Sequence, residues 1–231
     1  MKTAVVRSLR ITVALIASIA TGLGLAVAGP ASPALAAERN PIVFVHGYWG
    51  DDWNWSVMVD RFRSAGWSDD ELFVWDYNTA QSNVTTAHQL RDYIDDVLAQ
   101  TGASKVDVVT HSMGGLSSRY YLKFLGGTAH VEAWVSLGGP NHGTTAAYLC
   151  WDPSCSEMRP GSAFLTELNA GDESPGDVRY GTVWSSCDEI INPDESTIIS
   201  GATNHQTSGC VGHLGLLTSS EVFTLTRDFI H

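Results

Sequence analysis

The clearest indication of the fold is the stretch Val106-Asp107-Val108-Val109-Thr110-His111-Ser112-Met113-Gly114-Gly115. Its β-branched valines predict a strand that is buried on both faces. From Gly115 the apolar spacing changes to that of a helix, which we expect to end at Gly126-Gly127. A serine on such a strand–turn–helix corner is held in strained backbone geometry with its hydroxyl exposed. Ser112 is therefore the candidate nucleophile.

The pentapeptide Thr110-His111-Ser112-Met113-Gly114 resembles the G-x-S-x-G nucleophile elbow of α/β-hydrolases, with threonine in place of the first glycine. An ordinary turn that contains a serine is the alternative. Around this corner the chain alternates predicted strands and helices, which indicates a mostly parallel sheet with helices on both faces. We therefore expect a minimal α/β-hydrolase fold.

The predicted elements alternate along the chain as such a fold requires. Strands are expected at residues 41–45, 72–75, from 106 up to Ser112, 131–137, 180–184 and 197–200. Helices are expected at about 53–64, around 90–98, after Ser112, at 162–168 and at 220–230. The remainder of the segment from Pro140 to Asp177 is predicted to be irregular and is too short for a full cap domain.

An open apolar cleft is the consequence of lacking a cap. The aromatic and aliphatic residues of the irregular segment are either wall residues of that cleft or simple core: Tyr148, Trp151, Phe164 and Leu165.

The N-terminus resembles a secretory signal peptide. Three basic residues accompany an apolar run over residues 11–28, and Ala34-Leu35-Ala36 supplies the small-x-small pattern of a cleavage site. A membrane anchor is the alternative, because the apolar run approaches the length of a span. We expect cleavage after Ala36, so that residues 1–36 are the signal peptide. Residues 37–231 then form a single secreted, extracellular catalytic domain.

The acidic charge of the chain limits its partners. The net charge is −12, and three of the 13 Lys and Arg residues lie in the expected signal peptide, whereas all 25 Asp and Glu residues follow it. The expected mature domain therefore has a net charge of about −15, which argues against nucleic acid or an anionic membrane as a partner.

Ser112 needs a base to take its proton and an acid to orient that base. In α/β-hydrolases the chain order is Ser, then Asp or Glu, then His. His213 is the expected base because it lies in a loop just before the last predicted helix, and His205 is its rival. Asp188 is the expected acid because it follows the predicted strand at 180–184, at the carboxyl end of the sheet.

Two other acidic residues near Asp188 are weaker choices. Glu189 is adjacent and is expected to point elsewhere, and Asp194 follows Pro193 in a predicted surface turn.

Four cysteines in an exported chain predict two disulfides. Cys150 and Cys155 bracket a short loop and are expected to pair locally, which leaves Cys187 to pair with Cys210. The second bond would staple the acid loop to the histidine loop. A zinc site is the alternative, but the cysteine spacing fits none of the usual zinc patterns.

The oxyanion of a tetrahedral intermediate needs preorganised N–H donors. One is expected from the backbone of Met113, directly after the nucleophile, and the other from the loop after the first strand. His46-Gly47 turns that loop tightly, so Tyr48 is the expected second backbone donor. The imidazole of His46 is assigned a structural hydrogen-bonding role.

Together these motifs resemble the class 2 lipases, small secreted bacterial α/β-hydrolases. The resemblance rests on Val45-His46-Gly47-Tyr48, on the elbow at Ser112, on Asp188 and on the segment Gly212–Leu217. It implies hydrolysis of carboxylic esters, typically of lipids, by a Ser-Asp-His triad without a metal or other cofactor. Thr110 departs from the alanine of some close relatives, and a disulfide near the triad is not general to the family.

The expected function is therefore that of an extracellular lipase or esterase that acts on acyl glycerol esters through an acyl-enzyme. Its partner is a small-molecule or lipid ester substrate, with at most transient contact with lipid interfaces, and we expect a monomer. Related acyl-enzyme chemistry is the alternative: acyl transfer, polyester depolymerisation or peptide cleavage. A non-catalytic binding protein of the same fold is a third reading, against which the intact Ser112, Asp188 and His213 argue.

Overall fold

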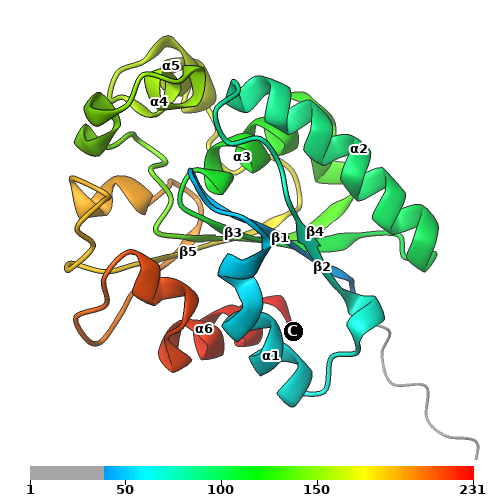
Figure 1. The fold of residues 1–231 in the computed structure, drawn as a ribbon. Helices are drawn as coiled ribbons and strands as arrows, with labels where there is room; N and C mark the ends of the chain where they lie inside the picture. Colours follow the sequence, from blue (N-terminus) through cyan, green and yellow to red (C-terminus); the bar gives the residue numbers. More distant parts are fainter. Residues whose placement is uncertain (1–38) are drawn as a thin grey trace, which may run out of the picture. The chain divides into compact units, whose positions relative to one another are not determined.

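A six-stranded parallel sheet runs through residues 39–231, the part of the chain that the computed structural model describes (Figure 1). The expected signal peptide and its cleavage site lie outside these residues. The strand order is β2-β1-β3-β4-β5-β6, and every pairing of neighbours is parallel. The strands are β1 (Ile42–Val45), β2 (Leu72–Trp75), β3 (Val106–His111), β4 (Val131–Leu137), β5 (Arg179–Trp184) and β6 (Thr203–Gln206).

Helices cover both faces of the sheet, as expected (Figure 1). The α-helices are α1 (Ser56–Ser64), α2 (Asn83–Thr101), α3 (Gly114–Phe124), α4 (Pro153–Met158), α5 (Ala163–Leu168) and α6 (Ser220–Ile230). Short 3-10 helices lie between them: η1 (Asp52–Trp55), η2 (Asp69–Glu71), η3 (Gly127–Ala129), η4 (Thr145–Leu149), η5 (Asp194–Thr197) and η6 (Leu214–Leu217). Within residues 39–231, no helix combines the length and the apolar composition that a transmembrane span requires.

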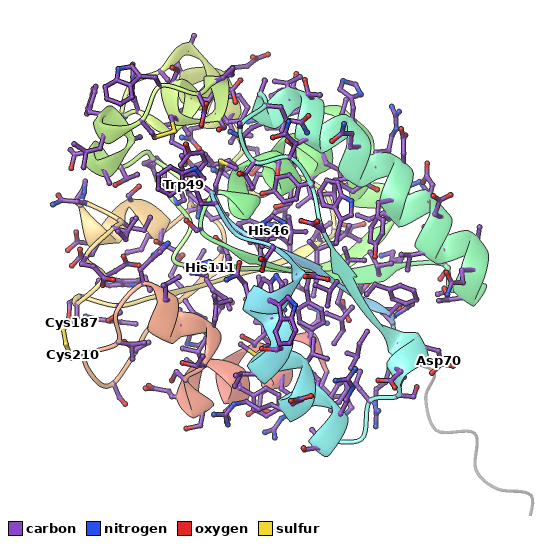
Figure 2. All side chains as sticks on the ribbon, in the orientation of Figure 1. His46, Trp49, Asp70, His111, Cys187 and Cys210 are labelled. Carbon is purple, nitrogen blue, oxygen red and sulfur yellow. A yellow bond between two sulfur atoms is a disulfide. The ribbon has the colours of Figure 1, made fainter. Side chains whose placement is uncertain are left out.

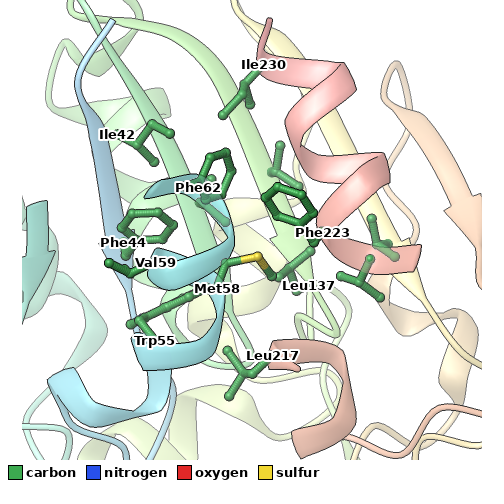
Figure 3. Packing of buried hydrophobic residues seen from close by; sticks show 14 of the residues in the cluster. Ile42, Phe44, Trp55, Met58, Val59, Phe62, Leu137, Leu217, Phe223 and Ile230 are labelled. Carbon is green, nitrogen blue, oxygen red and sulfur yellow. The ribbon is translucent and has the colours of Figure 1, made fainter. Parts of the chain in front are cut away.

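The alternation of side chains along β1 divides the core into two layers. Ile42 and Phe44 face α1 and α6, where they pack with Phe62 and Phe223 (Figure 3). Val43 and Val45 face the opposite way, into the cluster that α2 and α3 cover. All four β1 side chains are fully buried, which explains why this strand reads as a continuous apolar run.

The short helices between β4 and β5 form a third apolar cluster against the start of α3. Phe164 and Leu165 of α5 pack there with Met113 and Leu116. The predicted helix near 162–168 is confirmed, whereas α4 was not predicted. These short pieces do not amount to a full cap domain, so the prediction of a minimal α/β-hydrolase fold is confirmed.

The predicted strand at 197–200 is wrong. Thr197 ends η5, and the sixth strand is Thr203–Gln206, which pairs with β5. The side chain of Asn204 accepts from the N–H of Ile199 at 3.2 Å and donates to its carbonyl at 3.1 Å. These bonds satisfy the Ile199 backbone without a strand partner. The true strand, Thr-Asn-His-Gln, is a largely exposed edge strand, so apolar periodicity does not mark it.

Candidate active site

Ser112 stands on the corner between β3 and α3 with a φ of 54°, a strained value for a residue other than glycine. Its N–H donates to the carbonyl of Leu137 at 2.9 Å. Two glycines make room for this corner. A Cβ on Gly47 would lie 2.6 Å from the Ser112 Cβ, and one on Gly114 would lie 2.6 Å from the carbonyl oxygens of β1 and His46. The geometry is that of a nucleophile elbow.

The structure brings His213 and Asp188 together. His213 Nδ1 lies 2.8 Å from Asp188 Oδ2, and both side chains are buried. Because the carboxylate only accepts, Nδ1 carries the proton and donates, which leaves Nε2 free to take a proton. Ser112 and His213 line the same cleft. Within residues 39–231 the Ser112 hydroxyl makes no hydrogen bond, and such bonds often tighten only in the substrate complex.

The second oxygen of Asp188 is also occupied. Oδ1 accepts from the N–H groups of Ile190 at 3.0 Å and Ile191 at 2.9 Å. Burial by itself raises the pKa of Asp188, but the hydrogen bond and charge of His213 and these two N–H groups outweigh it. The pKa therefore lies below its ordinary value, and the carboxylate stays ionised.

Two further side chains, His111 and Glu189, hold the backbone of His213, and the sequence alone did not indicate this role for either. The ring of His111 lies 4.6 Å from that of His213, centroid to centroid, and its Nε2 is 3.1 Å from the His213 carbonyl. Burial, followed by the charge of His213, lowers the pKa of His111 to about 3, so the ring is neutral and Nε2–H donates. On the other side, Glu189 Oε2 accepts from the His213 N–H at 3.0 Å.

Glu189 was one of the alternative acids, and it contacts the backbone of His213 instead of its ring. Asp194, the other alternative, lies in η5 and does not line the cleft. His205, the rival base, lies on β6 and is also absent from the cleft lining. The sequence offered one indication that His111 belongs to the site, namely its position directly before Ser112.

Both predicted disulfides are present. Cys187 and Cys210 are bonded with their Cα atoms 5.2 Å apart, and Cys187 directly precedes Asp188 (Figure 2). Cys150 and Cys155 form the local bond, 5.8 Å between Cα atoms. The first bond ties the loop of the acid to the loop of the base. The second closes the short segment between η4 and α4.

The two expected oxyanion donors are unoccupied by protein acceptors. In the described part of the chain, the N–H groups of Tyr48 and Met113 make no hydrogen bond to another residue, although their neighbours do. Trp49, next to Tyr48, has a φ of 57° and donates its N–H to Thr79 Oγ1 at 3.2 Å. The Tyr48 hydroxyl donates to Asp152. These bonds hold the loop after β1 against its surroundings.

An apolar cleft of about 520 Å³ opens at this end of the sheet. Its rim carries large apolar side chains that are mostly exposed: Trp49, Leu149 and Leu214. The four residues considered as walls do not line it. Tyr148 and Trp151 are exposed outside it, and Phe164 and Leu165 belong to the core. In residues 39–231 no group of three or more His, Cys, Asp or Glu side chains is arranged to hold a metal ion.

Comparison with known proteins shows that this chain is similar to lipases in sequence. A family model described as lipase (class 2) matches residues 39–214. A triacylglycerol lipase of Burkholderia plantarii is 32% identical over 144 residues, which are 58% of this chain and 39% of that protein. A triacylglycerol lipase of Pseudarthrobacter phenanthrenivorans is 33% identical over 126 residues, 51% of this chain and 38% of that protein. These alignments span about two fifths of the length of either relative.

A solved structure extends the likeness to nearly the whole fold. Lipase BlEst2 of Bacillus licheniformis, in its mature form, superposes with a TM-score of 0.73 at 16% identity, and the match covers 84% of this chain and 93% of that one. At this identity the likeness concerns the fold alone.

Proposed function

Because the chain belongs to the class 2 lipase family, we propose that it is a carboxylic ester hydrolase that works through Ser112, His213 and Asp188. The observation that carries the proposal is the buried pair of His213 and Asp188, 2.8 Å apart, because His213 lines the same cleft as a serine on a strained corner. A nucleophile, a base and an orienting acid are the three parts that acyl transfer requires.

The proposed reaction follows from these positions. His213 Nε2 takes the proton of Ser112 as Oγ attacks the ester carbonyl carbon. The N–H groups of Tyr48 and Met113 stabilise the resulting oxyanion. His213 then gives the proton to the leaving alcohol, and an acyl-serine remains. A water molecule, activated by the same imidazole, attacks the acyl-serine and releases the carboxylic acid. Asp188 stays ionised and stabilises the imidazolium in both steps.

The proposed substrates are uncharged acyl esters, including acyl glycerols. The cleft is lined mainly by apolar atoms and is open to solvent, which suits an acyl chain. The names of the related triacylglycerol lipases agree with this choice. We also propose that the enzyme is secreted, with residues 37–231 as its catalytic domain. Two disulfides are consistent with an oxidising compartment.

The test is hydrolysis of p-nitrophenyl esters of increasing chain length, with a triglyceride emulsion alongside, by the wild type and by Ser112→Ala. We expect the variant to fold normally and to lose several orders of magnitude in kcat, on the order of 10⁴- to 10⁶-fold. A fluorophosphonate should label Ser112 stoichiometrically. Labelling at another residue would refute the assignment of the nucleophile, and peptide or acyl-acceptor turnover without ester hydrolysis would refute the assignment of the reaction.

A further inference from the structure

The loop that carries the Tyr48 N–H begins at His46, whose buried side chain lies at the carboxyl end of β1 (Figure 2). His46 is 0% exposed, and its ring stacks on that of Tyr77 with centroids 4.4 Å apart. The Tyr77 hydroxyl donates to the His46 carbonyl at 2.7 Å. Tyr77 therefore contacts His46 twice, by stacking on its ring and by a hydrogen bond to its carbonyl.

Both ring nitrogens of His46 face hydrogen-bond acceptors. Nδ1 lies 3.0 Å from the carbonyl oxygen of Gly47, and Nε2 lies 3.2 Å from Asp76 Oδ1. A neutral imidazole offers one donor and one acceptor, whereas an imidazolium offers two donors. A carbonyl and a carboxylate can only accept. Both contacts are hydrogen bonds at the same time only when the ring carries two protons.

The Gly47 carbonyl and the Tyr48 N–H belong to one peptide unit. That unit is planar, so a bond that fixes the oxygen also fixes the direction of the N–H. The carbonyl accepts from His46 Nδ1 and also from the Gly50 N–H at 3.0 Å. A charged donor makes a shorter and stronger hydrogen bond than a neutral one, and it polarises the group that it contacts. The N–H on the other side of the peptide becomes a better donor.

We propose that His46, as an imidazolium paired with Asp76, is a positioning residue of the oxyanion hole. The imidazolium orients and polarises the Gly47–Tyr48 peptide. It therefore affects the reacting oxygen through the Tyr48 N–H and makes no contact with that oxygen itself. The proposal rests on the proposed ester hydrolysis, and it extends the structural role assigned to His46 from its sequence.

The charged and titratable groups around the His46 ring favour a positive charge on that ring. Asp76 is the ion-pair partner of His46, and its side chain is 67% exposed, so the carboxylate keeps its hydration. Burial, followed by the charge of Asp76, raises the pKa of Tyr77, so its phenol stays neutral. His111 is neutral because its pKa is lowered to about 3, first by burial. The ring thus has one negative neighbour and no second positive one among these groups.

Two variants separate orientation from charge. His46→Phe keeps a ring against Tyr77 but removes both donors. Asp76→Asn is a nearly isosteric change at an exposed residue, so we expect the variant to fold. An asparagine can donate to Nε2, which allows the ring to keep only the Nδ1 proton and the same geometry. Asp96→Asn makes the same charge change on an exposed position of α2 and is the matched control.

The kinetic test uses p-nitrophenyl butyrate. His46→Phe should lower kcat by about 10- to 100-fold with KM nearly unchanged, since the peptide N–H acts on the developing oxyanion and loss of a whole donor costs about 10²–10³. Asp76→Asn should lower kcat by a smaller factor, about 3- to 10-fold, through loss of the charge. Binding of a trifluoromethyl ketone, which forms a tetrahedral adduct, should weaken in parallel with kcat. Asp96→Asn should match the wild type in each measurement.

Ring ¹⁵N NMR tests the protonation state independently of turnover. Both His46 nitrogens should be protonated in the wild type, and only one in Asp76→Asn. One bare nitrogen in the wild type would overturn the proposal, as would a folded His46→Phe or a neutral-ring Asp76→Asn with unchanged kcat. If His46→Phe does not fold, Asp76→Asn and the NMR result decide. A wild type that hydrolyses no ester would refute the proposed function, while the NMR measurement would still report on the ring.

Discussion

Asp107 in β3 is a buried carboxyl whose ionisation should destabilise the fold. It is 3% exposed, and its Oδ1 accepts from the N–H of Ala133 at 3.1 Å, where the register between β3 and β4 shifts. Burial raises its pKa from 3.8 to about 7, against the opposing effects of Arg179 and the Ala133 N–H. An acid whose pKa is raised on folding loses stability as the pH rises from its unfolded pKa to its folded pKa.

The size of the effect follows from this shift. Each pKa unit corresponds to about 1.4 kcal/mol, so a shift from 3.8 to about 7 gives an upper value of about 4 kcal/mol above neutral pH. Asp107→Asn keeps an oxygen acceptor for the Ala133 N–H but cannot ionise. We expect the variant to have a higher free energy of unfolding than the wild type at about pH 8. At about pH 3, below both the folded and the unfolded pKa, Asp107 is mostly protonated in both states, and we expect the free energy of unfolding of the variant to be similar to that of the wild type or lower.

Urea denaturation at several pH values measures this difference. The gain should grow between about pH 4 and pH 7 and then level off. Asp96→Asn, an exposed site on α2, should show no such rise. A pH-independent difference between Asp107→Asn and the wild type would refute the raised pKa, because only an ionisation that differs between the folded and unfolded states produces the slope.

Three further predictions concern the active site. The double variant Cys187→Ser with Cys210→Ser should lower the free energy of unfolding by roughly 3 kcal/mol. It should also lower kcat under conditions in which the variant is still folded, because the two loops are no longer tied together. Removing the Cys150–Cys155 bond should leave kcat nearly unchanged. Equal kcat in both double variants, from initial rates, would show that the first bond does not position the triad. His111→Phe should lower kcat by about tenfold at constant KM, because the His213 carbonyl loses its donor; an unaltered kcat would contradict that role. Exhaustive EDTA treatment should leave short-chain ester hydrolysis unchanged, and a loss restored by calcium would reveal an unrecognised metal site.

Much of the fold was predictable because the central elements carry strong local signals. The strands at 72–75 and 131–137 and the helix at 220–230 have the predicted boundaries. Buried parallel strands read as apolar runs, and amphipathic helices repeat every 3.6 residues. The edge strand β6 has neither property. Its backbone pairs with β5, but its side chains are mostly exposed, and the backbone of Ile199 before it is hydrogen-bonded to the Asn204 side chain.

The residues of the candidate site likewise fall into two groups, those that local sequence signals indicate and those that depend on long-range contacts. Ser112, Asp188 and His213 could be proposed from the sequence because each follows a recognisable strand or precedes a helix, so the topology predicts that they lie at one end of the sheet. The contacts of His111 and Glu189 with His213, and of His46 with Asp76, join residues that lie 24 to 102 positions apart. No periodicity encodes such contacts. The sequence does show which residue each of them neighbours: His111 adjoins Ser112, the proposed nucleophile, Glu189 adjoins Asp188, the proposed acid, and His46 adjoins Gly47, whose carbonyl its ring contacts. A polar residue next to a catalytic one is therefore worth examining first for a bond to another member of the site, because the chain already holds it within reach.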